Sequence, residues 1–328
     1  MKKILVIGAG AWGLAIANTL SLNNNNVLVS SIENDVIEEI NNLNSANKYL
    51  PNIKLSSNLK AISDYTAEII DCDFIFIAVP SLAVKLVISQ ISEISKINPN
   101  CEYVICSKGL DPDSLQLLSY CFNQYFSNKN CAILSGPNFA IEVASKLPTI
   151  TNICCTDKKS ADNIIKILNN SFFLAIHDYQ PVTAEICGVI KNILAIGCGI
   201  IDQMDLGVNA KAAIITYGSQ EIQKLAKYFN CSANIVTAAG FGDIFLTCSS
   251  TKSRNNNLGR MLAQGKNYND ISSNSVITYE GAHSALSIYK ISQQSNIKLP
   301  LCNAIYEIIY NNMTLEEIRS KIISTLIC

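Results

Sequence analysis

The sequence predicts an α/β fold, in which a doubly wound, Rossmann-like, mostly parallel sheet is followed by an all-α C-terminal domain. A short aliphatic strand at Lys3–Ile7 is followed by a glycine-rich turn, G-x-G-x-x-G, and then by an apolar helical pattern over 14–22. Segments typical of strands and helices then alternate to about residue 180, whereas nearly every later pattern has the helical period. A chain of 328 residues is long enough for two domains, which we place at 1–180 and 181–328.

The glycine-rich turn is typical of dinucleotide binding. Gly8 permits the tight turn, Gly10 lets the backbone approach a pyrophosphate, and Gly13 lets the helix pack closely on the strand. The N-terminus of the following helix offers unpaired N–H groups to phosphates. Glu33 lies twenty residues after Gly13, a spacing at which a carboxylate can accept hydrogen bonds from the adenine-ribose hydroxyls.

Two plainer explanations exist for these features. The first 18 residues carry two lysines, an apolar core and a small-residue Ala15-Ile16-Ala17 pattern, as a secretory signal does. Glu33 is also compatible with an ordinary carboxylate at a helix start. A signal core has no need of three glycines at these offsets, so we favour dinucleotide binding.

The remaining elements follow from apolar patterns and turn residues. Strands are expected at 27–32, 73–79, 101–106, 131–134, 149–155 and 172–176. Helices are expected at 35–43, 82–95, 113–125 and 160–168, with an irregular stretch at 44–57. The second half is expected to hold helices at 183–203, 209–229, from 258 onward, 282–294 and 301–309.

Ligands of such sheets bind beyond the carboxyl ends of the strands. Three strands after the first end in Val79-Pro80, Ser107-Lys108-Gly109 and Ser135-Gly136-Pro137. Turn chemistry alone explains the glycines and prolines. Lys108 places a cation directly after a buried strand on the ligand side, which favours a functional role.

Composition excludes several classes of function. A net charge of −1 gives no basic surface for nucleic acid and no polybasic membrane patch. The thirteen cysteines lie scattered in apolar segments without metal-ligand spacing, which favours buried thiols in a reducing compartment over disulfides or a metal site. The apolar stretch 189–201 is interrupted by two polar residues and is too short to span a bilayer. We therefore expect a soluble, cytoplasmic protein without a metal.

The helical half contains three groups that could do chemistry. Lys191 lies within an apolar helix and must reach water, a carboxylate or a ligand, although a lysine at the helix edge would satisfy the same pattern. Asp243, between glycines and apolar residues, suits a helix N-cap, a partner for Lys191, or both. Ser253-Arg254-Asn255 precedes a helix, where a guanidinium and N–H groups can bind phosphate; a solvated loop is the alternative.

Together these motifs resemble one family, the bacterial NAD(P)-dependent glycerol-3-phosphate dehydrogenases, from Met1 to about residue 310. The resemblance rests on a set of motifs in one order: 8–13 with Trp12, Tyr49-Leu50-Pro51, Val79-Pro80-Ser81, Ser107-Lys108-Gly109, Ser135-Gly136-Pro137-Asn138-Phe139-Ala140, Lys191-Asn192, Gly207-Val208-Asn209-Ala210, Gly240-Phe241-Gly242-Asp243, Ser253-Arg254-Asn255 and Glu280-Gly281.

The resemblance implies reduction of dihydroxyacetone phosphate to sn-glycerol 3-phosphate with NADH or NADPH, supplying phospholipid synthesis, by a protein that could form a homodimer. It implies that Lys191 is the acid/base, with Lys108 and Asp243 beside it. The implied substrate residues are Lys108, Gly136, Asn138, Lys191, Asp243, Ser253, Arg254 and Asn255. The implied cofactor residues are Gly8, Gly10, Ala11, Trp12, Gly13, Glu33, Tyr49, Lys108, Ala140, Arg254, Thr278 and Glu280.

Three positions depart from the family pattern. Asn138 replaces the usual Ser or Thr, and Ala11 replaces a frequent Ser that could donate to a phosphate. Glu33 stands near the position at which NADP-using members often have Arg or His, so we expect a preference for NAD(H). The rival interpretations are a β-hydroxyacid or 6-phosphogluconate-type dehydrogenase and a non-catalytic NADH-sensing regulator; the sequence shows no DNA-binding module for the latter.

Overall fold

The computed structural model describes residues 1–273 and 278–327, and the chain divides into two compact units. The first unit comprises Met1–Ser107 and Leu118–Pro181, and the second comprises Lys108–Leu117 and Val182–Cys328. Segment 108–117, which the sequence analysis assigned to the sheet domain, thus packs with the helices. Each unit is described separately.

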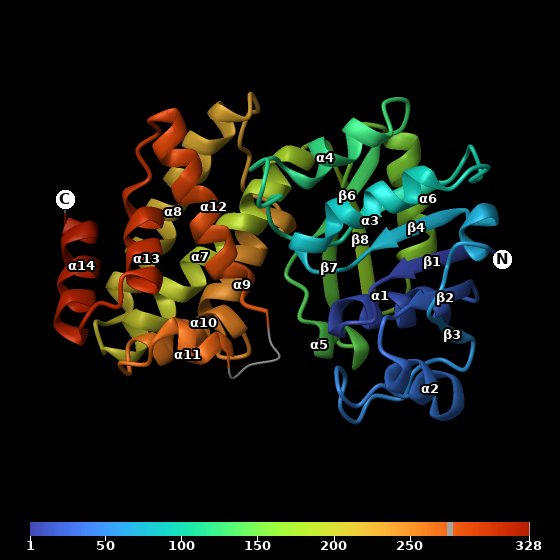
Figure 1. Cartoon of the computed structure of the whole chain (residues 1–328), viewed down its shortest axis with the longest axis horizontal. Helices are drawn as coiled ribbons and strands as arrows, with labels where there is room; N and C mark the ends of the chain where they lie inside the picture. Colours follow the sequence, from blue (N-terminus) through green and yellow to red (C-terminus); the bar gives the residue numbers. More distant parts are fainter. Residues whose placement is uncertain (274–277, 328) are drawn as a thin grey trace. The chain divides into compact units, whose positions relative to one another are not determined.

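The first unit is built on one eight-stranded sheet (Figure 1). Its strands are β1 (Lys3–Ile7), β2 (Asn26–Ser30), β3 (Leu59–Ile62), β4 (Phe74–Ile77), β5 (Glu102–Ile105), β6 (Cys131–Ser135), β7 (Thr149–Cys154) and β8 (Phe173–Asp178). Their order is β3-β2-β1-β4-β5-β6-β7-β8, and only β6 and β7 pair antiparallel. The predicted doubly wound, mostly parallel sheet is therefore confirmed. The chain winds outward in both directions from β1, which places a ligand crevice at the carboxyl end of β1.

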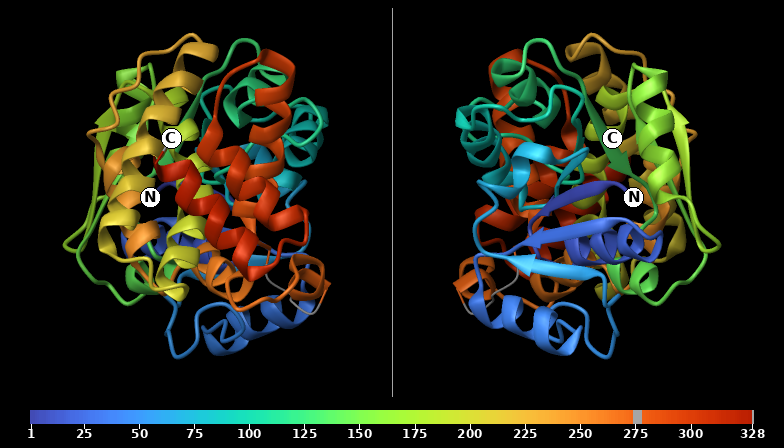
Figure 2. Two further views of the ribbon diagram at one scale, coloured as in Figure 1. Left: turned by 90° about the vertical axis from the view of Figure 1, so that its left-hand side faces the viewer. Right: turned by 90° about the vertical axis from the view of Figure 1, so that its right-hand side faces the viewer.

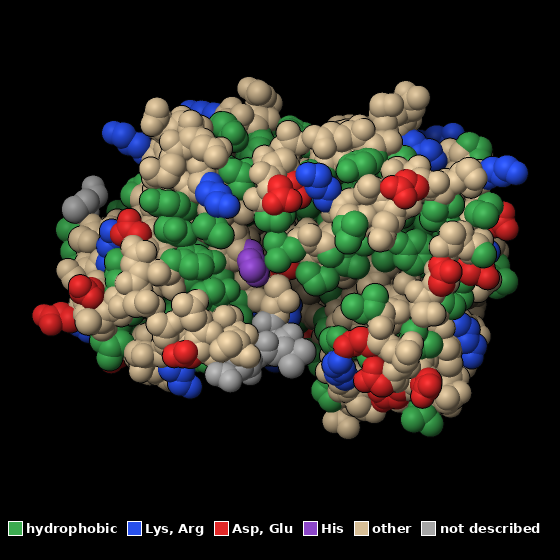
Figure 3. Space-filling model, viewed as in Figure 1, with side chains coloured by type: hydrophobic (Ala, Val, Ile, Leu, Met, Phe, Trp, Pro, Cys, Tyr) green, Lys and Arg blue, Asp and Glu red, His purple; other side chains and the backbone are tan. Residues whose placement is uncertain are grey.

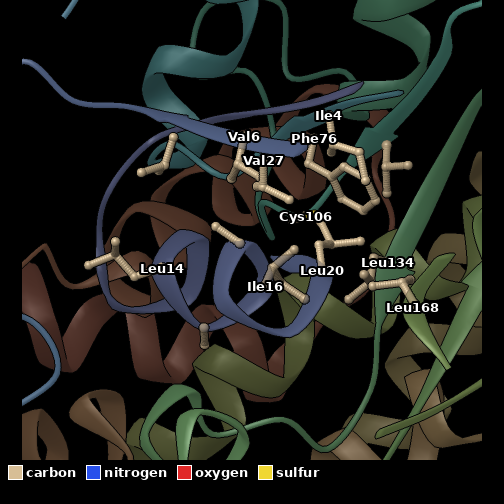
Figure 4. Packing of buried hydrophobic residues seen from close by; sticks show 14 of the residues in the cluster. Ile4, Val6, Leu14, Ile16, Leu20, Val27, Phe76, Cys106, Leu134 and Leu168 are labelled. Atoms are coloured by element: carbon tan, nitrogen blue, oxygen red, sulfur yellow. The ribbon is translucent and has the colours of Figure 1, made fainter. Parts of the chain in front are cut away.

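Six α-helices and one 3₁₀ turn complete this unit: α1 (Ala11–Leu22), α2 (Asn34–Leu43), the turn Glu68–Asp71, α3 (Ser81–Glu93), α4 (Leu118–Tyr125), α5 (Ala140–Ala144) and α6 (Lys158–Leu168). The buried core of this unit includes Leu14, Ile16 and Leu20 of α1 and Ile4 and Val6 of β1, and Ile16 and Leu20 lie on the side of the helix that faces the strands (Figure 4). Because both contacting surfaces are fully buried, the turn between β1 and α1 is held at a fixed place.

One strand was missed and the start of one helix was predicted wrongly. Strand β3 was not predicted, because four residues at a sheet edge carry little periodic signal; it extends the edge beside β2 (Figure 2). The helix expected over 113–125 begins only at Leu118. Before it, Leu110 pairs with Leu117 in an isolated antiparallel bridge, and Leu115 has a φ of 58°, which a helix does not allow.

The described part of the second unit is helical, apart from this isolated bridge. It contains α7 (Pro181–Gln203), α8 (Val208–Tyr228), the π-helical turn Ala238–Gly242, α9 (Asp243–Ser249), α10 (Arg254–Leu262), α11 (Tyr268–Ser273), α12 (Glu280–Ser295), α13 (Pro300–Tyr310) and α14 (Leu315–Ile327). The C-terminal helix α14 packs on α8 and α13 (Figures 1 and 2).

Helix α7 is the core of this unit. It is long and apolar enough to cross a membrane, but its apolar window is fully buried by other parts of the chain. At Gly199 the backbone of α10 comes so close that an added Cβ would lie 2.0 Å from the Asn256 carbonyl oxygen. Helix α7 is therefore a central packing element, and the side chains that it carries are held rigidly.

Candidate active site

The glycine turn after β1 has the geometry that phosphate binding requires. Gly8 has a φ of +111°, and a Cβ on Gly13 would lie 1.8 Å from the Gly8 carbonyl oxygen, so neither position accepts a side chain. At Gly10, by contrast, an added Cβ would meet nothing within 4 Å. Helix α1 begins at Ala11, and its N-cap Gly10 provides no side-chain acceptor for the first N–H groups. This leaves the helix start open to an anion.

Trp12 adds a second observation that fits a bound cofactor. Its indole Nε1 is buried and has no hydrogen-bond partner within the described chain. A buried donor without an acceptor costs free energy, and a polar ligand at the turn would supply one. Trp12, Tyr49 and Ala140 all pack against the hydrophobic core of this unit, although they come from three separate segments.

Glu33 follows β2 and is the N-cap residue of α2. One of its carboxylate oxygens, Oε2, accepts a hydrogen bond of 2.6 Å from the hydroxyl of Tyr49, and Oε1 pairs with the ammonium of Lys48. The hydrogen bonds from Lys48 and Tyr49 lower the pKa of Glu33. The structure thus joins two predicted cofactor residues, Glu33 and Tyr49, and adds Lys48, which sequence analysis missed because a loop conformation creates the contact.

Gly136 and Asn138 follow β6. A Cβ on Gly136 would lie 2.9 Å from the Cα of Thr151 and 3.1 Å from Oδ1 of Asn138, so only glycine fits. The Asn138 amide donates to the carbonyl oxygen of Ile150 at 2.8 Å and accepts from the Thr151 hydroxyl at 3.0 Å. The residue that departs from the family pattern is therefore anchored to β7, and its contact with a substrate stays a prediction.

Two lysines and one aspartate form a buried cluster in the helical unit. Asp243, at the start of α9, accepts from Lys191 Nζ on Oδ1 at 2.7 Å and from Lys108 Nζ on Oδ2 at 2.5 Å. Its side chain is 2% exposed, against 10% for Lys191 and 18% for Lys108. The hypothesis that Asp243 is a partner for Lys191 is therefore confirmed, whereas the N-cap hypothesis is wrong, because Gly242 is the N-cap of α9 and Asp243 is its first helical residue.

The side chain of Lys108 passes along α7 at Gly188 on its way to Asp243. Gly188 lies three residues before Lys191 on α7, and a Cβ there would touch the aliphatic stem of Lys108 at 3.4 Å. Thr247, four residues after Asp243, accepts from Lys191 at 3.2 Å and donates to the Asp243 carbonyl oxygen at 2.6 Å. Sequence analysis missed Thr247; a hydroxyl residue one helical turn after a buried aspartate is the signal that could have identified it.

Burial and charge set the protonation of this cluster. Burial and, to a smaller extent, the neighbouring Lys108 cation lower the pKa of Lys191 to about 8, against the opposing effect of Asp243. Burial acts to raise the pKa of Asp243, but the two ammonium groups outweigh it, and the net pKa is lowered. Asp243 thus remains ionised, and Lys191 can donate or accept a proton near neutral pH.

The segment expected to bind phosphate lies on a helix start. Helix α10 begins at Arg254, four residues earlier than expected, and Ser253 is its N-cap, with the Oγ accepting from the Asn256 N–H. Arg254 is exposed, whereas Asn255 is buried. The Asn255 amide donates to Asn192 Oδ1 at 3.0 Å and accepts from the Gly281 N–H at 3.1 Å.

Asn255 therefore links α7, α10 and α12, in addition to any contact with substrate. Glu280 is the first residue of α12, next to Gly281, and Thr278 follows the segment 274–277, which lies outside the described residues. The structure thus gathers Lys108, Lys191, Asp243 and Thr247 at one place. The roles in cofactor and substrate binding predicted for Ser253, Arg254, Asn255, Thr278 and Glu280 stay predictions.

Comparison with known proteins gives a consistent result. The family models for the N-terminus and C-terminus of NAD-dependent glycerol-3-phosphate dehydrogenase match residues 3–161 and 180–320. Proteins named glycerol-3-phosphate dehydrogenase [NAD(P)+] are 33% identical over 322 residues in Bacillus subtilis and 37% identical over 313 residues in Francisella tularensis. These alignments cover 96% and 94% of this chain, and 92% and 93% of the relatives.

A solved structure of the same family has a similar fold. The crystal structure of glycerol-3-phosphate dehydrogenase from Coxiella burnetii is 30% identical, with a TM-score of 0.93, and the match covers 100% of this chain and 99% of that one. Sequence and fold therefore agree over both halves of the molecule. The chain belongs to the NAD-dependent glycerol-3-phosphate dehydrogenase family.

Proposed function

We propose that this protein reduces dihydroxyacetone phosphate to sn-glycerol 3-phosphate with NADH or NADPH. The observation that carries the proposal is the buried carboxylate of Asp243 shared by two ammonium groups, in a chain of this family, with the pKa of one ammonium lowered to about 8. A ketone reduction needs a proton donor and a positive charge at the carbonyl oxygen. Lys191 and Lys108 supply both.

Each residue of the site has a separate role in the reduction. Lys191 donates a proton from Nζ to the carbonyl oxygen, and Lys108 stabilises the negative charge that builds on that oxygen. Asp243 holds both ammonium groups in place. Arg254 and the N-terminus of α10 bind the phosphate, so that binding energy remote from the carbonyl positions it. The cofactor, when bound, supplies the hydride.

The residues of the first unit fit a dinucleotide. The open space at Gly10 and the start of α1 would hold the pyrophosphate, and the unpartnered Trp12 Nε1 would gain an acceptor. Glu33 would accept hydrogen bonds from the ribose hydroxyls. Its negative charge would repel a 2′-phosphate, so we expect kcat/KM for NADH to exceed that for NADPH. Equal values would contradict this preference.

Oxidation of NADH, followed at 340 nm, tests the reaction. We expect turnover with dihydroxyacetone phosphate and none with ketones that carry a carboxylate in place of the phosphate. Lys191→Ala should lower kcat by about 10²-fold or more while the affinity for NADH is kept. Turnover with 2-keto acids alone, or full activity of Lys191→Ala, would refute the proposal.

We further propose that the product supplies phospholipid synthesis in the cytoplasm and that the enzyme is a homodimer. The twelve described cysteines are all free thiols, which supports a reducing compartment. Conditional depletion of the protein should stop growth unless glycerol 3-phosphate is supplied. Light scattering on the purified protein measures its mass, and a mass of one 35.7 kDa chain would contradict the dimer.

A further inference from the structure

Lys48 and Tyr49, in the loop that follows α2, both bind the carboxylate of Glu33. The Lys48 ammonium pairs with one oxygen and the Tyr49 hydroxyl donates to the other at 2.6 Å. The side chain of Lys48 is 40% exposed and that of Glu33 is 28% exposed, so the pair is open to a ligand. Figure 3 shows acidic and basic side chains together over α2 and the neighbouring loop.

The loop that carries these two residues is fixed. Ala46 and Leu50 are fully buried, and the backbone N–H groups of Tyr49 and Leu50 both donate to the Ala46 carbonyl oxygen. Glu39 of α2 accepts from the N–H of Asn47 at 3.0 Å, which ties the loop to the helix. Lys48 is therefore presented to Glu33 by a supported turn.

This arrangement has two consequences for a carboxylate that accepts ribose hydroxyls. A carboxylate offers about four lone-pair sites, so one bond to each oxygen leaves one site on each for the 2′- and 3′-hydroxyls. The Lys48 charge also offsets the Glu33 charge for any group that approaches both residues. A 2′-phosphate in the same place would meet a nearly neutral pair instead of an isolated anion.

Resting on the cofactor role proposed above for Glu33, we propose that Lys48 is a specificity-determining residue. It offsets the charge of Glu33 and thereby limits how strongly the enzyme rejects the 2′-phosphate of NADP(H). Without Lys48 the preference for NAD(H) becomes steeper. The pKa of Glu33, which is lowered by its bonds to Lys48 and Tyr49, agrees with a persistent ion pair.

Binding of cofactor fragments tests this without turnover. Trp12, the single tryptophan of the chain, lies in the glycine turn, so its fluorescence reports binding of ADP-ribose and of 2′-phospho-ADP-ribose. For Lys48→Gln we expect the ratio of the two Kd values to shift at least about fivefold further toward ADP-ribose. The ratio of kcat/KM for NADH and NADPH should move in the same direction. Lys48→Arg keeps the charge and should keep both ratios.

The matched control is Lys158→Gln, which removes another exposed ion pair of the same unit, that between Lys158 and Asp162 at 2.6 Å. It should leave both ratios unchanged. A Kd ratio in Lys48→Gln within twofold of the wild type would overturn the proposal, as would an equal shift in Lys158→Gln. Failure of the proposed reaction is a separate result, since fragment binding does not depend on dihydroxyacetone phosphate.

Discussion

Lys191 and Lys108 share one carboxylate inside the helical unit, and this sharing sets the chemistry of the site. An unpaired buried ammonium would be costly, and two facing each other would be more so. Asp243 offsets the cost of burying the two ammonium groups, because a separate carboxylate oxygen accepts a hydrogen bond from each of them. Burial still lowers the pKa of Lys191 to about 8, so that its proton is available near physiological pH.

The pH dependence of the reaction follows from this pKa. Ketone reduction needs the protonated form of Lys191, so kcat for reduction should be constant below about pH 8 and fall above it. Alcohol oxidation needs the neutral form and should show the opposite trend. Asp243 raises the pKa of Lys191 against burial, so Asp243→Asn should shift the fall in the reduction rate to lower pH. Profiles of kcat from pH 6 to 10 measure this; a reduction rate without a fall would contradict it.

Within the glycine turn, Gly10 is expected to be needed for cofactor binding, whereas Gly13 is needed for folding. Gly10→Ala should leave the melting temperature within about 2 °C, because its φ of −70° suits alanine and the added Cβ meets nothing within 4 Å. The methyl group would occupy the path of the pyrophosphate, so NADH affinity should fall by about tenfold or more. Gly13→Ala should instead fail to fold stably, since its Cβ would lie 1.8 Å from a carbonyl oxygen. Calorimetry and NADH titration test both; tight NADH binding by Gly10→Ala would refute the assignment.

Among the elements of the helical unit, α7 and α10 approach each other closely near the site. A Cβ on Gly199 of α7 would lie 2.0 Å from the Asn256 carbonyl oxygen, and one on Gly259 of α10 would lie 2.0 Å from the Ile196 carbonyl oxygen. The two helices therefore meet backbone to backbone. Because Arg254 is the first residue of α10, this crossing also sets where the guanidinium is placed relative to Lys191.

Gly259→Ala should therefore cost both stability and activity. Forcing the helices apart should lower the free energy of unfolding by about 1–3 kcal/mol, and the KM for dihydroxyacetone phosphate should rise as Arg254 moves. Gly188→Ala, at which the new Cβ makes only an ordinary 3.4 Å contact with the Lys108 side chain, should be neutral or stabilising. Urea unfolding compares the two; equal midpoints would show that the crossing tolerates a methyl group.

The same crossing shows where sequence analysis reached its limit. The β1–turn–α1 unit was predictable, because strand period, three glycines and helix period are local signals. The start of α10 was not, because a run of asparagines has weak helix propensity and packing decides the matter. Asn255 and Asn256 are buried there, and Asn255 bonds to two other helices. The ion pair between Lys48 and Glu33 likewise depends on the conformation of a loop, which no local sequence pattern predicts.

At the scale of the whole molecule, cysteines lie in the cores of both units. Eleven of the twelve described cysteines are buried, and only Cys231 is partly exposed. Burial raises the pKa of the Cys72 thiol to about 11 and that of Cys101 to about 12. Thiols of this kind act as small apolar side chains and react slowly, because the thiolate is the reactive form.

Titration of the thiols at pH 8 without reductant tests both the burial of the cysteines and the absence of disulfides. In a Cys328→Ser background, which removes the cysteine outside the described residues, we expect the native protein to show one fast-reacting thiol, and Cys231→Ser to abolish it. In guanidinium chloride all twelve remaining thiols should react. Several fast thiols in the native protein would mean that the cores open readily. Fewer than twelve after unfolding would reveal disulfides and argue for an oxidising compartment, against the proposed cytoplasmic location.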